Sequence, residues 1–157
     1  MTANTDHETV VRDSIDVAAT PEHAFEVFTR GIDRWWPRSH RVQPGELRQV
    51  GVDPHVGGRM WEENDAGETC AWGRVLTWDP PHTFAFSWLV GPDWKPPAPD
   101  AAGSRVTVTF TPTDTGTRVD LVHDRLDAHG PGWEGVRDAV GGDGGWPGIL
   151  RRFAGVL

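Results

Sequence analysis

Hydrophobic and polar residues alternate in several segments between residues 58 and 123, with the period of two that is typical of β-strands. Within residues 104–112, the apolar side chains at 106, 108 and 110 alternate with threonines, and the aromatic side chains at 84, 86 and 88 give residues 82–90 a similar pattern. One face of each strand is therefore expected to be buried and the other solvated. The predicted strands span residues 10–17, 58–64, 68–78, 82–90, 104–112 and 116–123, with a further short strand near 47–52.

The segments that join these strands are short and rich in turn-forming residues. Residues 64–67 and 113–116 are typical of tight turns between neighbouring strands. Parallel strands would need long crossover connections, so the sequence predicts an antiparallel sheet. The Pro-rich segment 91–103 is predicted to be an extended connector, and Trp94 within it leaves open that this loop folds back as a flap.

Helical periodicity occurs on both sides of the strand region. Residues 20–22 (Thr-Pro-Glu) form a typical helix start, and the helix is expected to end at Gly31. A second short helix is expected over residues 32–36. Near the C-terminus, helices are predicted over 133–140 and 146–157, with a run of glycines between them. The last helix carries an apolar stripe of Trp146, Ile149, Leu150, Phe153 and Leu157.

Chain length favours a single domain, residues 10–157, preceded by a flexible N-terminal segment, residues 1–9. The polar start lacks the pattern of a secretory signal, and no apolar stretch approaches the ~18 residues that a transmembrane helix needs. The only cysteine, Cys70, cannot form an intramolecular disulfide and favours a reducing compartment. We therefore expect a cytoplasmic protein that does not insert into membranes.

The formal net charge of -8 argues against general nucleic-acid binding, because attraction to phosphates is the main source of affinity there. Five arginines nevertheless occur between Arg30 and Arg48. A solvated, partly paired face is the favoured interpretation of this cluster. The alternative is an anion-facing patch at the mouth of a pocket.

The sequence contains no motif for a metal, a phosphate cradle or a nucleophile elbow, so no metal, cofactor or catalytic residue is predicted. His123 ends a strand on its inward face, where an imidazole can act as acid or base. A hydrogen-bonded structural role is the favoured interpretation. Glu62 and Glu63 are adjacent on one strand, and an exposed pair at its edge is favoured over an inward carboxylate.

Nine tryptophans and no tyrosine exceed what the core of a small domain needs. Pockets for small molecules are lined mainly by aromatic and apolar side chains, so some of these indoles are expected to line a cavity.

The order of elements resembles the START-like (SRPBCC) superfamily, and local phrases resemble its branch named for the activator of heat-shock-protein ATPase. These phrases lie at residues 20–28, 35–37 (WWP), 56–59 (VGGR), 72–75 (WGRV), 78–81 (WDPP), 116–119 (GTRV) and 145–150. The resemblance implies an α+β helix-grip fold, in which a curved antiparallel sheet wraps around a long C-terminal helix, with two short helices after the first strand. It also implies a deep pocket between sheet and helix.

The function implied by the resemblance is binding of a small apolar or aromatic molecule in this pocket, with no established catalysis. The candidate ligand-binding residues are Trp35, Trp36, Trp61, Trp72, Phe86, Trp88, His123 and Trp146. An enzyme of the polyketide cyclase or aromatase type, using the same cavity, is the alternative. A co-chaperone-like factor that binds another protein is the second alternative. The chain is expected to be a monomer or a homodimer.

Overall fold

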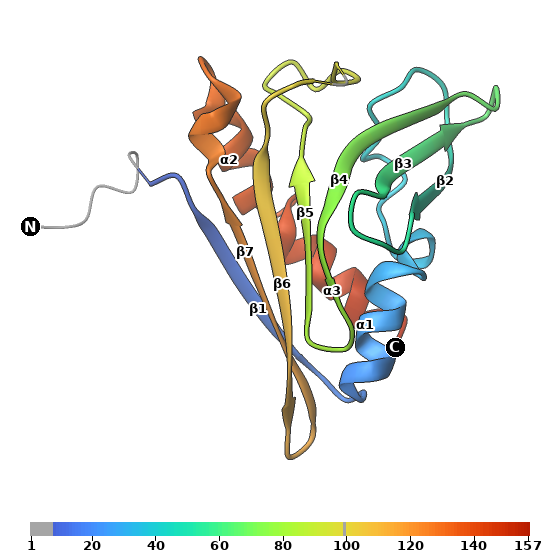
Figure 1. Ribbon diagram of the computed structural model, residues 1–157, viewed down its shortest axis with the longest axis vertical. Coiled ribbons are helices and arrows are strands. Elements are labelled where there is room, and N and C mark those ends of the chain that lie inside the picture. Colours follow the sequence, from blue (N-terminus) through green and yellow to red (C-terminus); the bar gives the residue numbers. More distant parts are fainter. Residues whose placement is uncertain (1–7, 99) are drawn as a thin grey trace, which may run out of the picture.

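Seven antiparallel strands form one curved sheet in the computed structural model, which describes residues 8–98 and 100–157. The order across the sheet is β1-β7-β6-β5-β4-β3-β2, so the first strand of the chain pairs with the last (Figure 1). The strands are β1 (Val11–Val17), β2 (Leu47–Val52), β3 (Arg59–Asn64), β4 (Thr69–Asp79), β5 (Thr83–Trp88), β6 (Ser104–Thr113) and β7 (Gly116–Asp124). The predicted antiparallel sheet is confirmed.

The sheet curls around the C-terminal helix, which lies behind β5 in the view of Figure 1. The helices are α1 (Pro21–Thr29), α2 (Trp133–Gly141) and α3 (Trp146–Gly155), with the 3₁₀ turns η2 (Ile32–Arg34) and η3 (Leu126–His129). This arrangement is the α+β helix-grip fold that the resemblance implied.

The helix starts follow from local chemistry. At α1, the Thr20 hydroxyl accepts a hydrogen bond from the His23 backbone N–H at 3.2 Å, and Pro21 occupies the first turn. Gly145 is the N-cap of α3, four residues after the end of α2, and a Cβ at this position would collide with the Val140 carbonyl. Only glycine therefore allows the chain to turn this sharply between the two helices.

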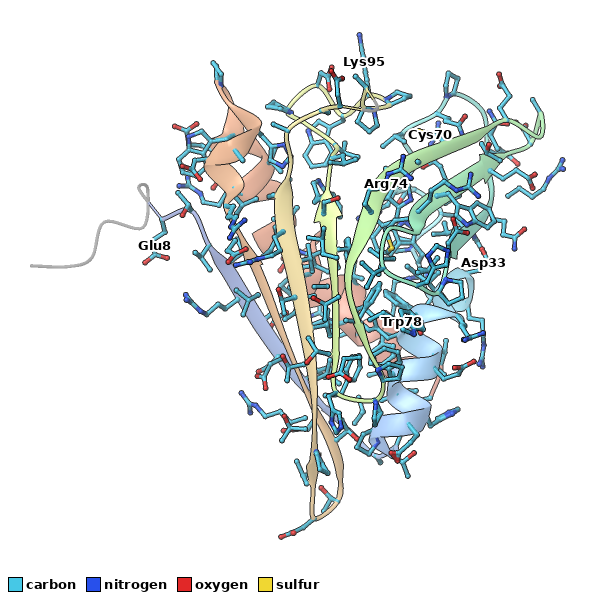
Figure 2. The ribbon with its side chains drawn as sticks, viewed as in Figure 1. Glu8, Asp33, Cys70, Arg74, Trp78 and Lys95 are labelled. Atoms are coloured by element: carbon cyan, nitrogen blue, oxygen red, sulfur yellow. The ribbon has the colours of Figure 1, made fainter. Side chains whose placement is uncertain are left out.

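The apolar stripe of α3 fills the concave face of the sheet. Phe153 is fully buried and packs edge-on against Phe28, with ring centroids 5.1 Å apart, and against Trp35 at 5.5 Å. On the other side of the core, α1 packs against β4, where Phe25 meets Trp78 at 5.2 Å (Figure 2). All three contacts have the edge-to-face geometry that aromatic rings prefer.

Element bounds agree with the sequence predictions to within two residues, with two exceptions. The expected helix over residues 32–36 is only the short turn η2, and η3 was not predicted. η3 follows Arg125, which adopts a left-handed conformation (φ 59°) that no local pattern indicated. The predicted flexible segment, residues 1–9, lies outside the described residues except for Glu8 and Thr9.

Within residues 8–98 and 100–157, no helix combines the length and the apolar character that crossing a bilayer requires.

Replacing Phe153 by Ala is expected to lower the free energy of unfolding by about 3–5 kcal/mol, because it removes a fully buried ring between α3 and α1. Arg151→Ala, at an exposed position of the same helix, is the matched control and is expected to change it by less than about 0.5 kcal/mol. Urea denaturation measures both. Similar small losses in the two variants would contradict the packing described here.

Candidate functional site

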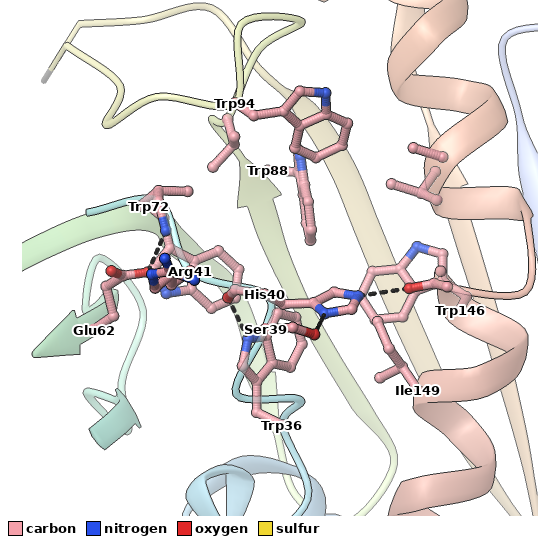
Figure 3. Close-up of a pocket in the computed structure, with 16 residues that line it drawn as sticks. Trp36, Ser39, His40, Arg41, Glu62, Trp72, Trp88, Trp94, Trp146 and Ile149 are labelled. Atoms are coloured by element: carbon pink, nitrogen blue, oxygen red, sulfur yellow. Dashed lines mark hydrogen bonds between the residues drawn. The ribbon is translucent and has the colours of Figure 1, made fainter. Parts of the chain in front are cut away.

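A cavity of about 330 Å³ lies between the sheet, α3 and the loop after η2 (Figure 3). Its volume falls at the lower end of the ~300–1,000 Å³ typical of small-molecule sites. The elements that form it also include the 91–103 loop and the end of α2. The cavity therefore lies where the helix-grip resemblance placed a pocket.

Four buried tryptophans from four different elements line this cavity. We call Trp36, Trp72, Trp88 and Trp146 the tryptophan quartet. Trp36 stacks on Trp72, with ring centroids 5.2 Å apart and planes inclined by 25°. The remaining neighbours, Trp72–Trp88, Trp88–Trp146 and Trp146–Trp36, meet edge to face at 5.7, 5.8 and 6.3 Å. Each ring thus contacts two others, and the closed set fixes the aromatic wall of the cavity.

A buried hydrogen-bonded chain holds Trp146 in this wall. Its indole Nε1 donates to Nδ1 of His123 at 3.0 Å. Because an indole only donates, His123 must carry its proton on Nε2, which donates to the Ser104 hydroxyl at 2.7 Å. The same hydroxyl lies 2.8 Å from Nε2 of His129 and donates to it when His129 is neutral.

Burial also keeps His123 neutral. It is fully buried, and burial lowers its pKa from 6.5 to about 3, with a further lowering from His129 and a weaker opposing effect of Asp124. Protonation of Nδ1 would also break the bond to Trp146. The imidazole is therefore a satisfied structural group, as the favoured interpretation of the sequence held.

Polar groups meet the cavity at the loop after η2. His40 Nε2 donates to the Gly144 carbonyl at 2.5 Å, which joins this loop to the glycine run before α3. In that tautomer Nδ1 accepts from the Ser39 hydroxyl at 3.1 Å. Arg41 also lines the cavity, whereas Arg38 pairs with Asp33 at 2.8 Å.

Glu62 is a buried carboxylate on the cavity wall, with 2% of its surface exposed. It accepts hydrogen bonds from the backbone N–H groups of Val42 and Gln43 at 3.0 and 3.1 Å. These bonds compensate the burial and attach the loop to β3. The expectation of an exposed pair was wrong for Glu62, because alternation along β3 turns Met60 and Glu62 to the same inner face.

The 91–103 loop contributes Trp94 to the cavity. This side chain is 42% exposed, and its backbone has a φ of 55°, which bulky residues rarely adopt. A turn bond from Trp94 N–H to the Gly91 carbonyl, 3.0 Å long, accompanies this conformation. The loop therefore does return to the apolar surface, as the flap interpretation expected.

Residues 18–157 match the family model described as activator of Hsp90 ATPase homolog 1-like protein. The chain belongs to this family.

Solved structures agree with this membership in the activator of Hsp90 ATPase homolog 1-like family. An anthrahydroquino-γ-pyrone synthase, Txn09, complexed with SUM, is 40% identical, with 97% of this chain and 99% of that chain covered and a TM-score of 0.68. The self-sacrificing resistance protein CalC from Micromonospora echinospora is 32% identical, with 95% and 94% covered and a TM-score of 0.65. Comparison with curated proteins gave no significant match.

The sequence-predicted site residues separate into two groups in this family member. The tryptophan quartet lines the cavity, whereas Trp35, Phe86 and His123 are buried outside its lining. Trp61 lies over Gly51 of the neighbouring strand, where a Cβ would collide with its indole. Sequence reasoning did not single out the remaining lining residues Ser39, His40, Val42, Val90, Ala139, Val140, Gly144, Gly145 and Ile149 as site residues.

The loop that supplies Ser39 and His40 has neither helical nor strand periodicity, so no pattern in the sequence pointed to them. Within the described part of the chain, no group of three or more His, Cys, Asp or Glu side chains is arranged to hold a metal ion.

His123 makes stability depend on pH. Its pKa is about 3 when folded and near 6.5 when unfolded, so the unfolded state binds more protons between these values. The contribution of neutral His123 to the free energy of unfolding is therefore fully present above pH 6.5 and is lost as the pH falls toward 3. From pH 7 to pH 4.5 the expected contribution of His123 to this loss is about 2–3 kcal/mol.

His123→Gln, which keeps an acceptor for Trp146 but cannot be protonated, is expected to remove this part of the pH dependence in urea denaturation. The exposed His23→Gln is the matched control and should keep the wild-type slope. Equal slopes in the two variants would refute the role given to His123.

Proposed function

We propose that this chain binds a flat polycyclic aromatic molecule in the cavity lined by the tryptophan quartet. The observation that carries the proposal is the closed set of four buried indoles around a cavity of about 330 Å³. Such a wall offers ring faces and ring edges, and aromatic guests interact favourably with both. The polar groups of Ser39, His40 and Arg41 supply the few orienting contacts that small-molecule sites usually contain.

The relatives support an aromatic ligand. By its name, the 40% identical synthase makes an anthrahydroquino-γ-pyrone, a compound of fused aromatic rings. Identity at this level over 97% of this chain makes a ligand of related shape the best-supported choice. The co-chaperone alternative has only the family name behind it. The cytoplasmic location and the monomeric or homodimeric state stay predictions from the sequence.

Titration with anthraquinone is expected to quench indole fluorescence and raise the melting temperature, whereas palmitate is expected to do neither. Trp72→Ala removes the partner that stacks on Trp36 and should weaken anthraquinone binding by roughly 10-fold or more. Trp61→Ala, outside the cavity lining, is the matched control and should leave the affinity within about 2-fold of wild type. Equal losses in both variants, or no binding to wild type, would refute the proposed site.

One observation favours an enzyme as a second candidate. The Ser39 hydroxyl and the His40 imidazole both line the cavity and are hydrogen-bonded to each other. In ring closure the side-chain hydroxyl adds to the ketone carbon, the C=O π bond opens, and the hydroxyl proton passes through Ser39 to His40 Nδ1. The imidazolium then returns a proton to the former carbonyl oxygen, which gives a cyclic hemiketal isomeric with the ketone. The Gly144 carbonyl, which already accepts from Nε2, would stabilise the resulting imidazolium.

The second candidate predicts that an aromatic ketone bearing an open, hydroxylated side chain is converted by the wild type into its cyclised isomer, followed by mass spectrometry and absorbance. Ser39→Ala should lower this rate by about 10²-fold or more while binding changes little. Recovery of the ketone unchanged after incubation with wild-type protein at saturating concentration would leave only the binding function.

A further inference from the structure

The indole N–H of Trp88 is buried without an acceptor. Only 6% of the surface of this residue is exposed, and Nε1 has no hydrogen-bond partner among the residues that the structure describes. Within the quartet, Trp36 donates to the His40 carbonyl at 3.2 Å and Trp146 donates to His123. Buried indole N–H groups usually find an acceptor, because an unpaired donor has lost its hydration without replacement.

Packing prevents Trp88 from turning its nitrogen elsewhere. Its ring meets Trp72 and Trp146 edge to face and lies tilted against His123, with centroids 5.5 Å apart. These three contacts come from β4, α3 and β7, and the Trp88 backbone is itself paired with Ser104 in the sheet. The direction of the N–H group is therefore set by the fold.

The nitrogen edge of Trp88 points toward the side of the cavity where Trp94 lies (Figure 3). Trp94 occupies its unfavourable left-handed backbone conformation at this place, and such outliers concentrate at ligand-binding sites. A fixed, unpaired donor and a large aromatic ring thus occur together at one side of the cavity.

We infer that the ligand carries a carbonyl, quinone or phenolic oxygen that accepts a hydrogen bond from Trp88 Nε1. This inference rests on the proposed function and narrows its ligand class. The rings of the quartet favour any flat aromatic molecule, with or without polar atoms. The unpaired N–H group instead raises the affinity for a ligand that places a hydrogen-bond acceptor at this one position. Oxygenated polycyclic compounds are therefore expected to bind more tightly than hydrocarbons of the same shape.

Anthraquinone and anthracene test this selection, because they share three fused rings and differ in two carbonyl oxygens. Trp88→Phe keeps an aromatic ring in the wall and removes only the donor and part of the ring. The affinities of both probes for wild type and Trp88→Phe are measured by fluorescence and calorimetry. Together they give the contribution of the interaction between the Trp88 N–H group and the carbonyl oxygens. The ratio of anthraquinone to anthracene affinity is expected to fall about 10-fold in Trp88→Phe.

An unchanged ratio, with both probes bound, would overturn this inference and leave the proposed function intact. Binding of neither probe to the wild type would refute the proposed function, and this inference with it. If Trp88→Phe lacks native near-UV dichroism, the test is made instead on the wild-type protein, by NMR of ¹⁵N-labelled tryptophan side chains. The Trp88 indole proton, assigned through its contacts with His123, should move downfield with anthraquinone and not with anthracene, and equal shifts would overturn the inference.

Discussion

The hydrogen bond from Trp146 to His123 joins the first residue of the terminal helix to the last inward position of β7. Both partners are almost completely buried, so losing either one would leave an unpaired polar group in the core. The bond fixes the plane of Trp146, and through edge-to-face contacts it fixes Trp36 and Trp88 as well. The cavity wall therefore depends on a histidine that does not line the cavity itself.

A second set of polar contacts shapes the opposite wall. The loop after η2 belongs to no helix or strand, and the buried carboxylate of Glu62 fixes it by accepting from two successive backbone N–H groups. His40 then ties the loop to the glycine run before α3. These contacts fix the loop at both of its sides, so that Ser39, His40 and Arg41 lie together in the lining of the cavity.

Most of the fold was predictable because the alternation of apolar residues along strands, and their spacing along helices, directly indicate which face of each element is buried. The inward positions of Phe84, Phe86 and Trp88 followed from period two alone, and α3 followed from its apolar stripe. The site was less predictable, because composition shows that tryptophans are abundant but not which of them face a cavity. β3 shows this clearly: Glu62 shares the inner face with Met60, whereas Trp61 points to the other face and lies over Gly51.

The proposed function and the inference about Trp88 together require that an aromatic ring system binds within the quartet and that Trp88 Nε1 donates a hydrogen bond to its oxygen. A crystal structure of the wild-type chain with anthraquinone tests this most directly. We expect the rings of anthraquinone within the quartet and one of its carbonyl oxygens about 2.7–3.2 Å from Trp88 Nε1. Anthraquinone bound outside this cavity, or inside it with Trp88 Nε1 still unpaired, would contradict the account.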